Sequence, residues 1–213
     1  MLIRWLYGQA TFFDLLTWAV GIVVAITVHE FAHAYAAFRS GDDTAKKLGR
    51  LSLNPLVHFD PIGTTLILIG GMGWGKPVPV DPWRFRNPRW DDVKVSFAGP
   101  ASNLIVVTVL LAVARNVSVP WEPWIPLVLT VVRVNLMLAF FNLIPLPPLD
   151  GSHILAGLLP PRQSSAYRRT FDRYGFLILI GLVMLAPGIL HLLVWVPANA
   201  FRTVLNKLLG MIP

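Results

Sequence analysis

The sequence contains no cysteine and few charged residues. Its 213 residues include 0 cysteines, and Asp, Glu, Lys and Arg together make up only 14% of the chain, against 55% hydrophobic residues. Without cysteine, disulfide bonds and thiolate metal sites are excluded, so any bound metal must use nitrogen and oxygen ligands. No polar stretch is long enough to build a separate soluble core. We therefore expect one membrane-embedded domain over residues 1–213.

Acidic residues are scarcer than basic ones. The chain has 11 Asp and Glu against 18 Lys and Arg, for a formal net charge of +7. The basic residues lie in the connections between apolar segments and are not interleaved with aromatic residues on one surface. This pattern favours orientation in a lipid bilayer and argues against a nucleic-acid partner.

Apolar segments of sufficient length predict an all-α polytopic membrane protein. Crossing a bilayer takes about 20 helical residues. Four segments qualify, at about residues 12–38, 93–114, 124–144 and 175–196. Pro187 and Gly188 interrupt the last one, so we expect it to kink or end early and to leave residues 197–209 as an interfacial helix.

A shorter apolar stretch decides the topology. Residues 61–72 are too few to span and rich in glycine, which predicts a re-entrant or interfacial hairpin. Residues 74–80 alternate glycine, proline and β-branched residues, which predicts an extended strand. Residues 39–94 and 145–174 then lie on one side with most of the basic residues, and loop 116–123 lies on the other with none. The positive-inside bias places the basic side in the cytoplasm and both chain ends outside.

The first predicted span carries the sequence His-Glu-Phe-Ala-His at residues 29–33. Residues four apart share a helix face, so His29 and His33 can bind one Zn²⁺ through their imidazoles. Glu30 is then placed to act on a metal-bound water. A chance match is the alternative, but ionisable side chains within a membrane span are costly unless paired or metal-bound. The metal site is the better interpretation.

A catalytic zinc takes three protein ligands and keeps one open position. Asp150 is the best candidate for the third ligand, because prolines before it break the third span and present its carboxylate at the membrane edge. In the predicted topology it lies at about the depth of His29 and His33, reachable from the cytoplasm. A plain turn role before Gly151 is the alternative, and His153 is a weaker competitor for the metal.

Three further polar residues have open interpretations. The Asn142 amide could bind substrate or the developing oxyanion, or could cap its helix. Asn103 could orient a metal ligand, although small-residue packing around Gly99 is the favoured explanation of its segment. His58 could likewise support the metal site, but a structural role in its loop is favoured.

Several motifs together resemble the site-2 protease family of intramembrane zinc metalloproteases. Besides residues 29–33, they are Asn-Pro-Leu-Val-His-Phe-Asp-Pro-Ile-Gly at 54–63, Gly-Trp-Gly-Lys-Pro-Val-Pro-Val at 73–80, Gly-Pro-Ala-Ser-Asn at 99–103 and Asn-Leu-Ile-Pro-Leu-Pro-Pro-Leu-Asp-Gly at 142–151. The similarity covers about residues 28–155, which is more than half of the chain.

The resemblance implies a three-helix catalytic core at about residues 12–155, followed by the C-terminal span and interfacial helix at about 175–210. It implies one Zn²⁺ per chain on His29, His33 and Asp150, with Glu30 as general base. The implied substrates are transmembrane segments of other proteins. The residues at 74–80 could form a strand that pairs with such a segment once it is unwound, or could be an ordinary hairpin lying on the membrane. The chain is similar to the minimal form without a PDZ or CBS domain, expected in a prokaryotic plasma membrane. A non-proteolytic metal-binding scaffold is the alternative, and the intact Glu30 argues against it.

Overall fold

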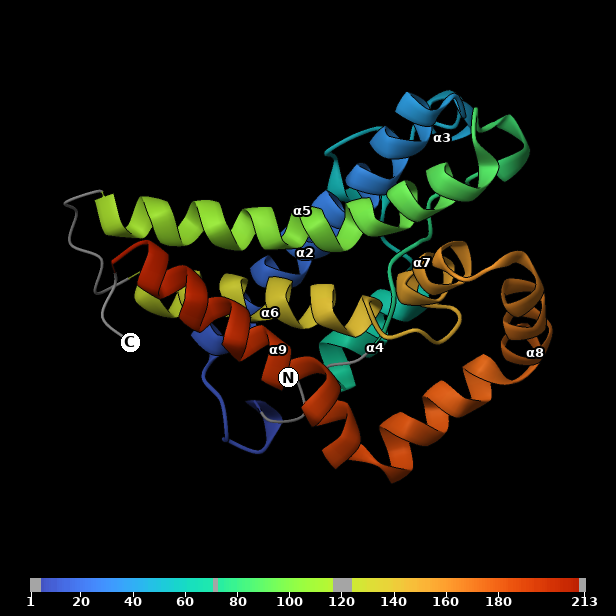
Figure 1. Ribbon diagram of the computed structural model, residues 1–213. Coiled ribbons are helices and arrows are strands. Elements are labelled where there is room, and N and C mark those ends of the chain that lie inside the picture. The colour runs from blue at the N-terminus through green and yellow to red at the C-terminus, as the bar shows by residue number, and fades with distance from the viewer. Residues whose placement is uncertain (1–4, 71–72, 117–123, 211–213) are drawn as a thin grey trace.

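The computed structural model describes residues 5–70, 73–116 and 124–210, and the regular structure of these residues is helical (Figure 1). The elements are α2 (Phe12–Ser40), α3 (Thr44–Lys47), η1 (Pro55–Val57), α4 (Pro61–Gly70), η2 (Pro82–Arg84), α5 (Pro88–Asn116), α6 (Ile125–Asn142), α7 (Asp150–Leu158), α8 (Pro161–Leu185) and α9 (Pro187–Leu208). Within these described residues, 4 helices are long and apolar enough to cross a membrane, namely α2, α5, α6 and α9. The predicted all-α membrane fold is confirmed. The predicted loop 116–123 lies almost wholly outside the described residues.

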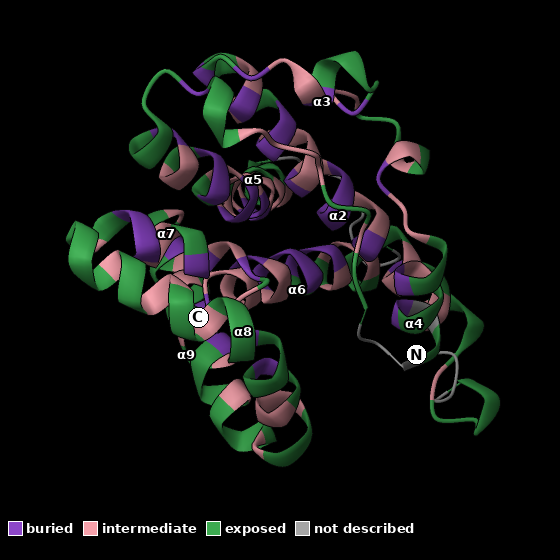
Figure 2. Cartoon of the chain, turned by 90° about the vertical axis from the view of Figure 1, so that its right-hand side faces the viewer, coloured by how far each residue is buried: buried purple, intermediate pink, exposed green. Residues whose placement is uncertain are grey.

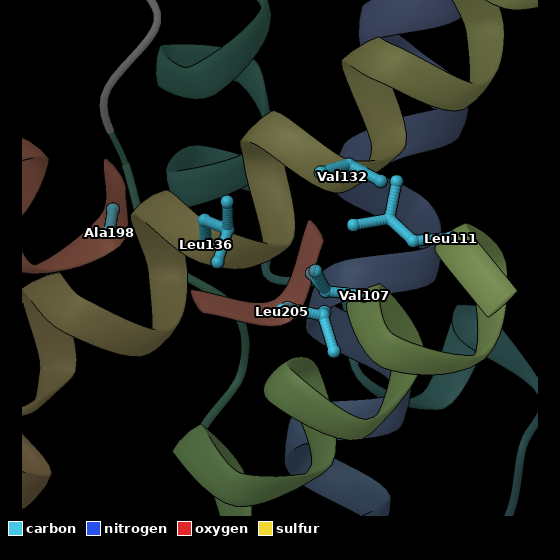
Figure 3. Packing of buried hydrophobic residues seen from close by; sticks show 6 residues of the cluster. All are labelled: Val107, Leu111, Val132, Leu136, Ala198 and Leu205. Carbon is cyan, nitrogen blue, oxygen red and sulfur yellow. The ribbon is translucent and has the colours of Figure 1, made fainter. Parts of the chain in front are cut away.

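Helices α2, α5 and α6 pack against one another and form the core (Figure 1). Buried residues gather where these three helices face each other, whereas α8 is largely exposed (Figure 2). Helix α9 packs against α5 and α6 through an apolar cluster to which all three helices contribute (Figure 3). Burial of such side chains from water or lipid into a close-packed interior holds the helices in one arrangement.

The C-terminal helices agree with the prediction in one respect and differ in another. The expected interruption of segment 175–196 at Pro187 is confirmed, since α8 ends at Leu185 and α9 begins at Pro187. Proline has no N–H to continue α8 but suits the first position of a new helix, which explains the break. The spanning helix is therefore α9, and residues 197–208 belong to it instead of forming a separate interfacial helix. Ala198 and Leu205 are buried in the cluster with α5 and α6.

The segment that follows α4 does not form the predicted strand. Helix α4 is too short to span, as expected of residues 61–72, of which 71–72 lie outside the described residues. The chain then turns back, because the Lys76 N–H donates to the His58 carbonyl at 2.8 Å. Residues 73–81 have no strand partner among the described residues. Pro77 and Pro79 lack an N–H, and the Val78 N–H bonds a side chain, so the segment has few donors for a strand ladder.

Candidate metal and catalytic centre

Three predicted metal ligands meet inside the helical core. The ligand atoms of His29, His33 and Asp150 all lie within 4.8 Å of one another. Asp150 Oδ2 lies 3.1 Å from His29 Nε2, and Asp150 Oδ1 lies 3.4 Å from His33 Nε2. Ligand atoms of a tetrahedral zinc, at about 2.0–2.2 Å from the metal, lie about 3.3–3.6 Å apart. The two distances to Asp150 are close to this spacing, so the cluster can hold one Zn²⁺.

Asn103 fixes the orientation of His29. Its Nδ2 donates to the Ala25 carbonyl at 3.0 Å and to Asn135 Oδ1 at 2.9 Å, so its Oδ1 is left to accept from His29 Nδ1–H at 2.7 Å. Asn135 in turn donates to the Val131 carbonyl at 2.8 Å. With the proton on Nδ1, the Nε2 lone pair of His29 is free to bind a metal.

His33 is oriented by a backbone group of α5. Its Nδ1 lies 2.7 Å from the Val95 carbonyl oxygen, which can only accept, so Nδ1 carries the proton and Nε2 faces Asp150. Gly99 allows α5 to approach this closely. A Cβ at position 99 would lie 2.4 Å from His33 Nε2 and 2.7 Å from His29 Cε1. The absence of a side chain at Gly99 thus leaves space for the two imidazoles and also allows the helices to pack closely.

Asp150 begins α7, directly after the proline-rich turn that follows α6. Its two oxygens face the Nε2 atoms of His29 and His33. Oδ2 is buried and accepts no hydrogen bond from the described residues. A buried carboxylate oxygen without a donor, facing imidazole lone pairs, fits a divalent cation.

Glu30 lies beside the cluster on α2 and is held from the other side by the segment after α4. Its Oε2 accepts from the Val78 N–H at 3.0 Å. This segment is fixed in turn by Arg50, a buried residue whose Nη2 donates to the Lys76 carbonyl, and by the Lys76 N–H bond to the His58 carbonyl. The carboxylate is thus positioned by backbone groups that sequence reasoning could not assign.

The remaining predicted residues have other contacts. Asn142 donates to the Leu138 carbonyl of its own helix at 3.0 Å, which leaves its second N–H for another acceptor. His58 is fully buried, with Nε2 at 2.6 Å from the Ser52 carbonyl oxygen. His153 lies 3.3 Å from Asp92, which raises the pKa of His153 against the effect of burial. His153 is not part of the metal cluster.

The Asn103 contact leads to a prediction for metal affinity. Asn103→Ala leaves the His29 Nδ1–H without an acceptor, and we expect zinc affinity to fall about 10- to 100-fold. Chelator competition against purified protein measures the change. Asn116→Ala removes a comparable bond at the exposed end of the same helix and should leave the affinity unchanged. Equal zinc affinities of Asn103→Ala and wild type would contradict the role of Asn103.

The site therefore consists of two imidazoles and a carboxylate, with a glutamate beside them, among membrane-spanning helices. This arrangement places the protein in the class of membrane zinc metalloproteases. The model of peptidase family M50 matches residues 115–186. YwhC of Bacillus subtilis, which carries the name zinc metalloprotease, is 39% identical over 208 residues, or 91% of this chain and 90% of that protein. Rip2 of Mycolicibacterium smegmatis, which carries the same name, is 31% identical over 77% of this chain and 65% of its own length.

A zinc metalloprotease of Methanocaldococcus jannaschii is 30% identical over 67% of this chain and 35% of that protein. No solved structure matched the chain. The chain belongs to peptidase family M50, the site-2 protease family, and is a membrane zinc metalloprotease.

Proposed function

We propose that this protein hydrolyses peptide bonds within or near transmembrane segments of other membrane proteins. The observation that carries the proposal is the cluster of His29, His33 and Asp150 next to Glu30 within the bundle of apolar helices. We assign the three as the ligands of one Zn²⁺. When bound there, zinc would bring the pKa of a coordinated water close to neutrality and polarise the substrate carbonyl.

Glu30 is the proposed general base. Since Val78 occupies Oε2, the other oxygen is left to accept the proton of the attacking water. The water oxygen bonds to the carbonyl carbon, the C–N bond breaks, and Glu30 returns the proton to the leaving amine. The hydrogen bond from the Val78 N–H restricts the rotation of the carboxylate and so keeps the base directed at the site.

Substrate recognition follows from the need to unwind a helix. A helical segment hides its carbonyls in hydrogen bonds, so it must become extended before attack. Pairing of such a segment with residues 74–80 remains a prediction. Fewer donors are left there than a strand would offer, because the N–H groups of Lys76 and Val78 are engaged. We retain the Asn142 amide as a candidate for the oxyanion or the substrate backbone.

The proposed orientation places the centre toward the cytoplasm of a prokaryotic cell. The absence of cysteine makes this directly testable with single substitutions. Leu48→Cys, next to α3, should react with an impermeant maleimide only in inverted vesicles, and Asn116→Cys, at the other end of α5, only from outside intact cells. The reverse pattern of labelling would invert the proposed topology.

The segment that holds Glu30 supplies a second prediction. Arg50→Met removes the buried donor to the Lys76 carbonyl, and we expect faster hydrogen exchange in residues 73–81 and cleavage slower by roughly tenfold. Zinc content should stay at the wild-type level. Arg39→Met, at an exposed arginine near the end of α2, serves as the matched control. Unchanged exchange and cleavage in Arg50→Met would show that Arg50 does not position the segment.

The decisive experiment uses the purified protein in detergent. Bound zinc is quantified, and a model transmembrane substrate is incubated with the protein before its fragments are mapped by mass spectrometry. One zinc per chain and a cut within or beside the apolar segment are expected. Zinc without cleavage of several such substrates would favour a metal-binding scaffold, and absence of zinc would contradict the ligand assignment.

A further inference from the structure

An apolar cavity of about 320 Å³ adjoins the proposed catalytic centre and plays no part in the roles assigned above. Helices α2, α4, α6 and α9 line it, and among its described lining residues only His191 has an ionisable side chain. The volume is about twice that of a cavity that holds one benzene molecule, so it can take one or two large apolar side chains.

The cavity begins one helical turn from Glu30. Ile26, one of its lining residues, lies one helical turn before Glu30 on the same face of α2. Ile26 also contacts the segment that holds Glu30, since a Cβ on Gly75 would lie 2.8 Å from Ile26 Cγ2. From Ile26 the cavity follows α2 to Trp18, a length of about 12 Å along the helix axis.

Trp18 gives the far end of the cavity a polar group. Its indole Nε1–H is buried and has no acceptor among the described residues. Buried indole N–H groups normally have a hydrogen-bond partner. The acyl chain of a lipid has no acceptor to offer at this depth, whereas an unwound peptide has free carbonyls. The indole therefore favours a peptide occupant over a lipid one.

We propose that this cavity is the specificity pocket of the protease, and that it receives large apolar side chains of the unwound substrate on the outer side of the cleaved bond. This inference rests on the proposed proteolytic function and names the residue class that the site selects. Leucine and phenylalanine fit the apolar lining. Alanine leaves the pocket largely empty, and a charged side chain would meet an apolar lining in which His191 is the one ionisable group among the described residues.

Photocrosslinking in an inactive background tests occupancy without depending on cleavage. A benzophenone amino acid replaces Ile22, which lines the cavity, or Leu16, an exposed control on the same helix, in Glu30→Gln protein. Both proteins are reconstituted with a model transmembrane substrate in phosphatidylethanolamine and phosphatidylglycerol vesicles. The probe at position 22 should crosslink the substrate beside the mapped bond, and the probe at position 16 should crosslink lipid. Lipid adducts alone at position 22 would overturn the proposal.

A specificity exchange tests selection. In wild type, replacing the substrate's pocket residue Leu by Ala should lower kcat/KM by about 10- to 100-fold. Phe141→Ala enlarges the pocket and should shift the preference toward Trp, whereas Phe140→Ala, one residue away in the cluster with α9, should leave the preference unchanged. If cleavage depends on Glu30 but substrates with Leu and with Ala are cut equally well, the pocket assignment is contradicted and the proposed proteolytic function is not. Lack of cleavage by zinc-loaded wild type counts against the proposed function, and the crosslink still decides occupancy.

Discussion

Glu30→Gln should abolish most cleavage while leaving the bound zinc in place. Glutamine has nearly the same shape and its carbonyl oxygen can still accept from the Val78 N–H, so the segment after α4 should stay attached. It cannot take a proton from water, however, and loss of a general base costs about 10²- to 10⁴-fold in rate. Metal analysis and single-turnover cleavage of the same preparation measure both quantities.

A matched acidic control separates this chemistry from a general loss of charge. Asp43→Asn removes an exposed carboxylate that pairs with Lys47 and Arg84 outside the core, and its activity should equal that of wild type. Retained cleavage in Glu30→Gln would exclude Glu30 as the base. Zinc loss in that variant would instead assign Glu30 a role in holding the metal centre together.

Gly99→Ala should weaken zinc binding at the metal centre. The added methyl group would lie 2.4 Å from His33 Nε2, 2.6 Å from His33 Cε1 and 2.7 Å from His29 Cε1, well inside contact distance. Either the imidazoles turn away from Asp150 or α5 moves away from α2. Overpacking of this kind costs about 1–3 kcal/mol, so zinc binding should weaken roughly 5- to 150-fold and cleavage should fall with it.

Gly181→Ala provides the comparison for this substitution. Gly181 lies within α8, and a Cβ there meets nothing within 4 Å, so the replacement should leave zinc and activity unchanged. Zinc titration and cleavage assays of both variants, beside circular dichroism to verify helix content, give the result. A Gly99→Ala protein that binds zinc as tightly as wild type would contradict the close approach of α5 to the imidazoles.

The sequence predicted those parts of the centre that depend on residue type. His29, Glu30 and His33 have a recognisable helical spacing, and Asp150 follows a proline-rich break of the kind that exposes a carboxylate. The structure brings the two histidines and Asp150 together. Their role as zinc ligands stays a prediction until zinc is measured.

Backbone contacts could not be predicted in the same way. The Val95 carbonyl orients His33 and the Val78 N–H holds Glu30, yet neither contact depends on a side chain that a motif would display. Asn103 was noted in the sequence but favoured as a packing residue. Its hydrogen bond to His29 depends on how α5 packs against α2, and that packing cannot be read from the sequence. Asn135 did leave a signal, as a polar residue within an apolar span.

The C-terminal spans were misplaced for a different reason. Hydropathy marks residues 175–196 as one apolar stretch, but it does not register how completely Pro187 separates two helices. The choice of α9 as the spanning helix depends on which side chains pack against α5 and α6, and that is a tertiary property. The strand predicted at 74–80 did not form within the described residues, because its prolines and its engaged N–H groups leave few donors for a ladder.

The hydrogen-bonded chain from His29 through Asn103 to Asn135 also bears on how the protein is made. Its members come from α2, α5 and α6, one polar side chain from each span. Helices inserted separately into a bilayer would each expose an unsatisfied polar group to lipid, which favours their association. The chain is complete only when all three helices meet in one register. Newly inserted protein should therefore become able to capture zinc at the same step at which its core becomes resistant to proteolysis.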